Sequence, residues 1–193
     1  MTKKGILTVI SGFSGAGKGT IVHELVDRYG YAVSISATTR DPRAGEQDGV
    51  HYFFKTKEEF EQMIADGALI EYASYVDNYY GTPKDYVMQK LEQGIDVILE
   101  IEMQGALKVK ERFPEKTIWC FTGYVFEKDI LNRMIPKWKY TKKMLEQIDY
   151  LVDGPFVEAK NDITLRFRGS SNQRIIDVKK SLETGEVVLW EEQ

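Results

Sequence analysis

Short apolar runs alternate with amphipathic stretches along the first 117 residues, a pattern typical of parallel strands joined by helices. Apolar runs predict strands at 6–10, 32–35, 52–54, 69–76 and 96–101. Apolar positions at helical spacing predict helices at 18–28, 56–67, 83–94 and 104–112. Thr56 and Glu59 form a predicted capping box, Gly30 a predicted helix end, and 38–49 a polar loop. This order predicts an α/β fold with a parallel sheet flanked by helices.

The pattern changes beyond residue 117. Strands are expected at 118–121 and 150–152, with helices at 127–134 and 140–148 between them. From Asn161 onward only short strand-like pieces follow, at 163–167, 174–176 and 187–190. We therefore expect two parts, 1–117 and an atypical C-terminal part at 118–193, whose strands could complete the sheet begun by the first part.

A Gly-rich stretch follows the first predicted strand and opens the first predicted helix. It reads Gly-Phe-Ser-Gly-Ala-Gly-Lys-Gly-Thr over residues 12–20 and matches the phosphate-binding loop pattern up to its lysine. Glycines let backbone N–H groups turn onto phosphate oxygens, and the helix N-terminus adds partial positive charge. We therefore expect the phosphates of a nucleoside triphosphate to be held by Gly12, Ser14, Gly15, Ala16, Gly17, Lys18, Gly19 and Thr20.

The lysine of such a loop neutralises the phosphoryl group in transfer, so Lys18 is a predicted catalytic residue. The next position usually supplies a hydroxyl to magnesium, but Gly19 stands there. Direct ligation of magnesium by the protein is therefore not predicted, and Thr20 is the nearest hydroxyl.

Residues further along suit a second, monophosphate substrate. Arg40 and Arg43 flank a proline in a polar loop and suit a phosphate group, to which Tyr52 and Tyr80 could add hydroxyl donors. Glu71 follows in a predicted strand and offers only acceptors when ionised. Guanine presents two adjacent donors, N1–H and the 2-amino group, and adenine has no such pair. A carboxylate at this position would therefore select guanine.

Residues 5–115 resemble guanylate kinase, the family that phosphorylates GMP with ATP. The resemblance rests on the phosphate loop and on five further segments, at 38–43, 49–54, 70–73, 80–83 and 98–106. It implies a P-loop nucleoside-monophosphate-kinase fold with a small β-rich GMP-binding insertion. It also implies transfer of the ATP γ-phosphate to GMP, with Mg²⁺ accompanying ATP.

The same resemblance implies roles for individual residues. Arg40, Arg43, Tyr52 and Tyr80 would hold the GMP phosphate, with Arg40 and Arg43 also catalytic. Ser36, Glu71, Thr82 and Glu100 would read the guanine. Some family members carry Asp where Glu100 and Glu102 stand, so these two rank below Glu71.

The family pattern stops after the predicted strand at 118–121. A guanylate kinase continues with a Pro-Pro turn and an arginine-rich lid, but no Pro-Pro follows here and only Arg133 falls in the lid region. Four lysines, Lys137, Lys139, Lys142 and Lys143, could substitute, although a solvated helix face is the simpler interpretation. A missing lid arginine predicts reduced turnover, or a nucleotide-binding module without catalysis.

Residues 118–193 instead resemble the C-terminal part of the activating protein of anaerobic ribonucleoside-triphosphate reductase. The similar segments are 119–124, 151–156 and 167–178. That family needs a three-cysteine iron–sulfur motif, whereas Cys120 is the only cysteine here. The chain therefore reads as a chimera joined between Phe113 and Ile118, whether a natural fusion, an engineered sequence or an artefact of sequence assembly. A remnant of the activating protein is the remaining alternative.

Composition narrows the setting. One cysteine excludes an intrachain disulfide and a cysteine-based metal site, and favours a reducing cytoplasm. A net charge of −4 gives no reason to expect nucleic acid as a partner. No secretory signal and no apolar run long enough for a membrane span is recognised, so we expect no membrane partner. The expected partners are ATP and GMP, as the resemblance implies. Nothing in the sequence determines the oligomeric state.

Overall fold

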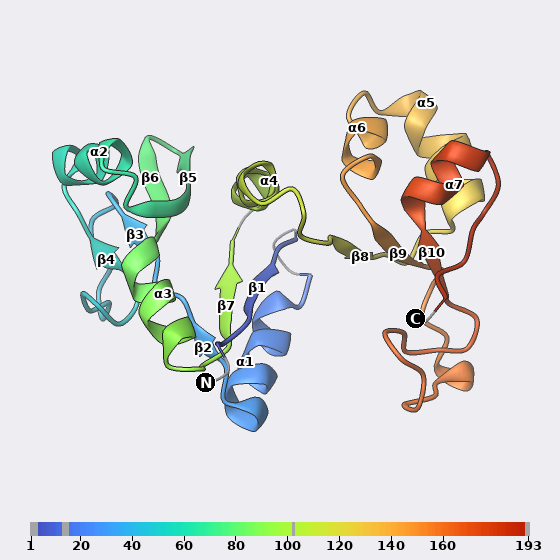
Figure 1. Ribbon diagram of the computed structural model, residues 1–193, viewed down its shortest axis with the longest axis horizontal. Helices are drawn as coiled ribbons and strands as arrows, with labels where there is room; N and C mark the ends of the chain where they lie inside the picture. Colours follow the sequence, from blue (N-terminus) through green and yellow to red (C-terminus); the bar gives the residue numbers. More distant parts are fainter. Residues whose placement is uncertain (1–3, 13–15, 102, 192–193) are drawn as a thin grey trace. The chain divides into compact units, whose positions relative to one another are not determined.

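The computed structural model describes residues 4–12, 16–101 and 103–191. The chain divides into two compact units, Met1–Pro114 and Glu115–Gln193, here called the N-terminal and C-terminal units (Figure 1). Each has its own buried core. None of the helices within the described ranges is both long and apolar enough to span a membrane.

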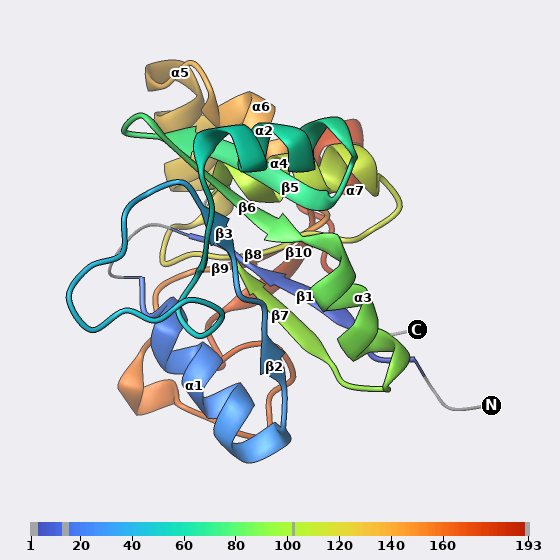
Figure 2. The same cartoon turned by 90° about the vertical axis from the view of Figure 1, so that its left-hand side faces the viewer.

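A three-stranded parallel sheet forms the centre of the N-terminal unit. Its strands are β1 (Leu7–Ile10), β7 (Val97–Glu100) and β2 (Ala32–Val33), in the order β1-β7-β2 (Figure 2). β7 lies in the middle, and Val97–Leu99 are fully buried, which explains its continuous apolar run. Helix α1 (Lys18–Tyr29) contacts β2 and β7, and α3 (Lys84–Glu92) contacts β7. The predicted parallel α/β arrangement is confirmed.

A second, mostly antiparallel sheet of four strands belongs to the same unit. Its order is β4-β3-β6-β5, with β4 (Phe53–Phe54), β3 (Ala37–Thr38), β6 (Asn78–Pro83) and β5 (Leu69–Tyr75). The sequence pattern missed two of these strands. β3 falls partly in the predicted loop at 38–49, and β6 falls in a stretch rich in Gly, Pro and Thr that resembles a turn.

Helix α2 (Lys57–Ala65) covers the second sheet and begins as predicted. The Thr56 side chain accepts from the Glu59 N–H at 3.1 Å, and the Glu59 carboxylate accepts from the Thr56 N–H at 2.8 Å. Phe60 of this helix is fully buried and stacks on Tyr79, with ring centroids 5.3 Å apart. The capping box therefore fixes where the helix starts, and the aromatic stack fixes which face it buries.

Helix α4 (Met103–Arg112) packs along β5, the outer strand of the second sheet. Val109 of α4 and Ile70 of β5 share one apolar core with Val87 of α3 and the buried residues of β7. This helix therefore joins the two sheets of the N-terminal unit.

The C-terminal unit has a three-stranded sheet of its own. Its order is β10-β9-β8, with β10 (Arg174–Asp177) antiparallel and β8 (Trp119–Phe121) parallel to the central β9 (Tyr150–Asp153). A core centred on Phe126, Leu145 and Leu151 packs on it. The remaining helices are η1 (Phe126–Met134), α5 (Ile135–Lys137), α6 (Thr141–Leu145), η2 (Glu158–Lys160) and α7 (Val178–Thr184). That this segment extends the sheet of the N-terminal unit stays a prediction.

Several elements of the C-terminal unit differ from expectation. Helix α7 was not predicted, and of the strand predicted at 187–190 only an isolated bridge between Leu189 and Ile176 forms. The helix predicted at 127–134 is a π-helix, in which the Ile130 N–H donates to the Val125 carbonyl five residues back. Its buried residues, Phe126, Ile130 and Met134, are spaced by four, which suits a helix wound more widely than α. The strand predicted at 163–167 is wrong: the segment forms turns, because Asp162 accepts hydrogen bonds from the backbone and side chain of Thr164.

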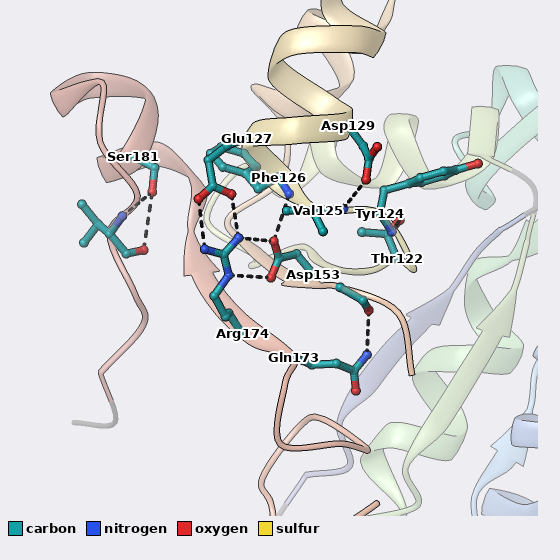
Figure 3. A network of polar contacts seen from close by, with 12 residues as sticks. Thr122, Tyr124, Val125, Phe126, Glu127, Asp129, Asp153, Gln173, Arg174 and Ser181 are labelled. Carbon is teal, nitrogen blue, oxygen red and sulfur yellow. Dashed lines mark hydrogen bonds and ion pairs between the residues drawn. The ribbon is translucent and has the colours of Figure 1, made fainter. Parts of the chain in front are cut away.

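A buried carboxylate organises the polar contacts of this unit (Figure 3). Asp153, 1% exposed, accepts from the Arg174 guanidinium and from the Phe126 N–H at the start of η1. Arg174 also forms a bidentate pair with Glu127, which lowers the pKa of that carboxyl. The network thereby ties β9, β10 and η1 together.

Candidate functional site

The described part of the phosphate loop lies between β1 and α1, as predicted. Gly12 follows β1 by two residues, and Gly17 is the N-cap of α1 with φ of 83°, a left-handed conformation that favours glycine. Gly17 has no side chain to cap the helix, and the first turn of α1 contains no acidic residue. The N–H groups at this helix end are therefore suited to an anion.

Lys18 begins α1, and its ammonium group donates to the Gly12 carbonyl at 2.7 Å. This contact folds the lysine back along the loop. Ala16 and Thr20 are exposed at the same helix end, beside the half-buried Gly19. Ser14 and Gly15 lie outside the described residues, and so does Glu102.

Arg40 lies beside two of the other residues expected at the GMP phosphate. Its guanidinium carbon is 5.4 Å from the centre of the Tyr52 ring, and the Tyr52 and Tyr80 rings meet edge to face at 6.3 Å. Glu46 accepts from Arg40 Nη2 with both carboxylate oxygens at 3.0 Å. The structure therefore brings Arg40, Tyr52 and Tyr80 together, and it adds Glu46, which the sequence analysis did not assign.

Glu46 accepts hydrogen bonds from both predicted phosphate-binding arginines, from the side chain of Arg40 and from the backbone of Arg43. Its Oε2 accepts from the Arg43 backbone N–H at 2.7 Å, so the loop closes on itself while the Arg43 side chain stays exposed. This N–H, and then Arg40, lower the pKa of Glu46 although desolvation opposes them. Desolvation lowers the pKa of Arg40, but Glu46 and then Tyr80 outweigh it, so that pKa is raised. Both groups are therefore charged at neutral pH.

Glu71 and Thr82 form the second predicted group. Glu71 is 6% exposed, and its Oε1 accepts from the fully buried Thr82 hydroxyl at 2.7 Å. The β5–β6 register shifts between Leu69 and Tyr72, and such an irregularity re-aims the side chains within it. Burial raises the pKa of Glu71, although Thr82 and Lys108 act against this rise.

Strand β6 connects the arginine group with the carboxylate group. Tyr80 and Thr82 are two residues apart on it and therefore point to the same face, about 7 Å apart along the strand. Thr38 of β3 pairs with Tyr80, and the same register brings Ser36, which precedes β3, level with Thr82. Glu100 ends β7 opposite Ile10 of β1, with an exposed side chain.

Two threonines next to Arg40 hold this loop against β6. The Thr38 hydroxyl donates to the Tyr79 carbonyl at 3.0 Å and accepts from the Arg40 N–H, and the Thr39 hydroxyl accepts from the Tyr79 N–H at 2.9 Å. The resemblance included this segment without giving the threonines a role. The position of these threonines directly before Arg40 was the feature of the sequence that could have indicated a role in holding the loop.

A pocket of about 220 Å³ lies between β5 and α4. Its lining includes Glu71 together with Tyr72, Lys108 and Arg112, but none of the other predicted GMP residues. The basic residues of the predicted lid belong to the C-terminal unit. Arg133 lies on η1, 3.5 Å from Asp129, and Lys137 lies over the ring of Trp138.

Comparison with known proteins places these features in one family. The family model for guanylate kinase matches residues 4–148. Guanylate kinase of Oceanobacillus iheyensis is 50% identical over 165 residues, covering 84% of this chain and 76% of that protein. That of Bacillus subtilis is 44% identical over 178 residues, covering 84% and 87%.

The fold agrees with a solved structure. Guanylate kinase from Anaplasma phagocytophilum superposes with a TM-score of 0.53 at 26% identity, covering 82% of this chain and 81% of that one. The family match also runs past residue 117, into η1 and α6 of the C-terminal unit. The chain belongs to the guanylate kinase family.

Proposed function

We propose that this chain transfers the γ-phosphoryl group of ATP to GMP, yielding ADP and GDP. The observation that carries the proposal is strand β6. It presents Tyr80 to a charged arginine and Thr82 to a buried carboxylate, about 7 Å apart along one face. A purine nucleoside monophosphate has an anionic end and a hydrogen-bonding base edge, so these two groups suit its two ends.

At the phosphate end, Arg40 supplies the main positive charge, with Tyr52 and Tyr80 beside it. Its Nη2 donates to both oxygens of Glu46 and its Nη1 donates to the Asp41 carbonyl at 2.6 Å, so two nitrogens of the guanidinium are held before substrate arrives. Arg43, exposed three residues later, adds a second charge to the same acceptor phosphate. These residues orient a GMP oxygen for in-line attack on the γ-phosphorus.

At the base end, Glu71 reads guanine. When ionised, its two oxygens accept from N1–H and the 2-amino group, and the Thr82 hydroxyl holds Oε1 in place. Ser36 and Glu100 are proposed to complete the base site. Adenine has no matching donor pair, so AMP is rejected.

At the ATP end, Lys18 and the N-terminus of α1 neutralise phosphate charge. The family implies Mg²⁺ with ATP, and the nearby donor is an exposed hydroxyl, that of Thr20, an oxygen of the kind magnesium binds. No cluster of three or more His, Cys, Asp or Glu side chains that could hold a metal ion occurs within the described ranges. When bound, the ion would offset negative charge on the phosphates of ATP, and Thr20 is the residue that could hold it.

We further propose that residues 1–117 contain both nucleotide sites and that the protein acts in the cytoplasm. The segment 118–193, whose first part the family model matches up to residue 148, has only Arg133 in the lid region, so turnover is reduced relative to a kinase with an arginine-rich lid. Its resemblance to the activating protein of anaerobic ribonucleoside-triphosphate reductase stays a prediction.

A coupled assay of ADP formation tests this function. ADP should appear with GMP and ATP, and neither AMP nor omission of GMP should support the same rate. ATP and GMP binding without turnover would indicate a nucleotide-binding module, and an iron–sulfur absorbance band after anaerobic reconstitution would indicate activating-protein chemistry instead.

A further inference from the structure

The first turn of α4 approaches the Glu71 carboxylate at a glycine. A Cβ added to Gly105 would lie 2.5 Å from Glu71 Oε2, closer than real Cβ atoms come to other atoms, and 3.1 Å from Glu71 Cδ, a tight contact. It would also lie 3.3 Å from Ile101 Cδ1. Only glycine therefore lets the carboxylate occupy its present position.

The opposite side of that carboxylate is also enclosed. Oε1 accepts from Thr82, which is fully buried, and Glu71 itself is almost fully buried. A side chain at position 105 would thus push a carboxylate that is held between β6 and α4. Glycine is unfavourable inside a helix, and the close approach of Glu71 is a packing reason for a glycine at this position.

Two cations further along the same face hold α4 in register with β5. Lys108 donates to the Tyr72 carbonyl, with its ammonium group 4.0 Å from the centre of the Tyr72 ring. Arg112 donates to the Leu69 carbonyl at 2.9 Å and to the Ile70 carbonyl at 3.3 Å. Spacings of three and four residues align Gly105, Lys108 and Arg112 on one helix face.

These contacts use carbonyls on either side of Glu71. Arg112 contacts the two residues before it and Lys108 the residue after it. The backbone that carries Glu71 is therefore fixed to α4, with Gly105 opposite its carboxylate. The charge of Lys108 and the positive end of the helix also favour the ionised carboxylate.

We propose that the Gly105–Lys108–Arg112 face of α4 is a positioning device for guanine selection, with Gly105 as the residue that sets where the Glu71 carboxylate lies. These residues act through Glu71 and are not catalytic. The proposal rests on the function proposed above, in which Glu71 reads guanine.

The test compares GMP with IMP, which lacks only the 2-amino group of guanine, in steady-state assays of the full chain. Gly105→Ala should lower the ratio of kcat/KM for GMP to that for IMP on the order of tenfold, because a displaced carboxylate misaligns its second acceptor. The change should appear in KM for GMP, with KM for ATP unaltered. The matched control is Gly123→Ala, since a Cβ there meets nothing within 4 Å.

A double-mutant cycle separates positioning from general damage. Glu71→Asp withdraws the carboxylate by about one methylene from position 105, so Gly105→Ala should change the ratio less than twofold in that background. Lys108→Met adds no atoms near Gly105 and should lower the ratio of kcat/KM for GMP to that for IMP several-fold. If Gly105→Ala does not fold, the result for Lys108→Met tests the proposal in its place.

The outcomes distinguish two failures. If Glu71→Gln leaves the ratio of GMP to IMP unchanged, the guanine-reading role of Glu71 is refuted. If Glu71→Gln lowers the ratio but Gly105→Ala and Lys108→Met do not, the positioning role of α4 is refuted. An equal loss from Gly105→Ala in the Glu71→Asp background also refutes it.

Discussion

Replacing Glu71 with Gln should weaken catalysis and strengthen the fold at the same time. Burial raises the pKa of Glu71, so the native state disfavours its ionised form relative to the unfolded chain, where 4.5 is the ordinary value. The resulting cost is fully present well above that raised pKa and disappears as the pH falls below about 4.5. Gln removes the charge and should stabilise the protein at neutral pH.

The loss of activity follows from the hydrogen bonds of the site. Thr82 donates to Oε1, so a Gln amide keeps this bond only with its oxygen toward Thr82 and its NH₂ group in place of Oε2. One guanine donor then faces another donor. Losing a hydrogen bond to a charged group costs about 1.5–3 kcal/mol, or roughly 10- to 150-fold in kcat/KM for GMP.

Two measurements check this prediction. Urea unfolding from pH 3.5 to 8 should show Glu71→Gln more stable than the parent at neutral pH, with the difference shrinking toward acid pH. Steady-state kinetics should show the loss for GMP with KM for ATP unchanged. A variant that is less stable at neutral pH, or a stability difference independent of pH, would refute the account of Glu71 as a buried, ionised acceptor.

Two further predictions concern stability. Val76 adopts φ of 46° in the two-residue turn between β5 and β6, a conformation that suits Asn better than a β-branched residue. Val76→Asn should therefore stabilise the protein by about 1 kcal/mol in chemical denaturation. No gain in stability would contradict the interpretation of the turn as strained. Arg174→Met leaves the buried Asp153 without its cation and should lower the free energy of unfolding by roughly 2 kcal/mol, less than the ~3–5 kcal/mol of a fully buried pair because 34% of the Arg174 side chain is exposed. Glu127→Gln, at the exposed end of the network, should lower it by under about 1 kcal/mol. Equal losses of stability in the two variants would refute this ranking.

The sequence predicted most of the parallel sheet because its central strand β7 is buried and its outer strands β1 and β2 are half-buried, so all three are apolar. The apolar runs around β1 and β7 are short and rich in Val and Ile, which favours strands, and the glycines around α1 mark its ends. The hairpin of β5 and β6 was missed. Its turn, Val76-Asp77, has positive φ at both residues without the Asn-Gly signal of such turns, and Tyr80-Gly81-Thr82 lacks an apolar alternation.

The residues of the candidate site could be predicted from the sequence, but the contacts between them could not. Arg40 and Glu71 stand out because a loop arginine and a strand carboxylate suggest a ligand, and the family resemblance assigned them ends of GMP. The pairing of Glu46 with Arg40 depends on a loop conformation that no periodicity encodes. The role of Gly105 depends on how α4 lies against β5, a tertiary contact between residues 34 positions apart.

The central claim is GMP-dependent transfer of phosphate from ATP, and one measurement tests it directly. ADP formation by the full chain is followed with GMP, with AMP and with neither, for the parent and for Lys18→Ala. The account predicts a GMP-dependent rate that exceeds the AMP rate and that Lys18→Ala abolishes. Equal rates with AMP and GMP, or a GMP-dependent rate that survives Lys18→Ala, would contradict it.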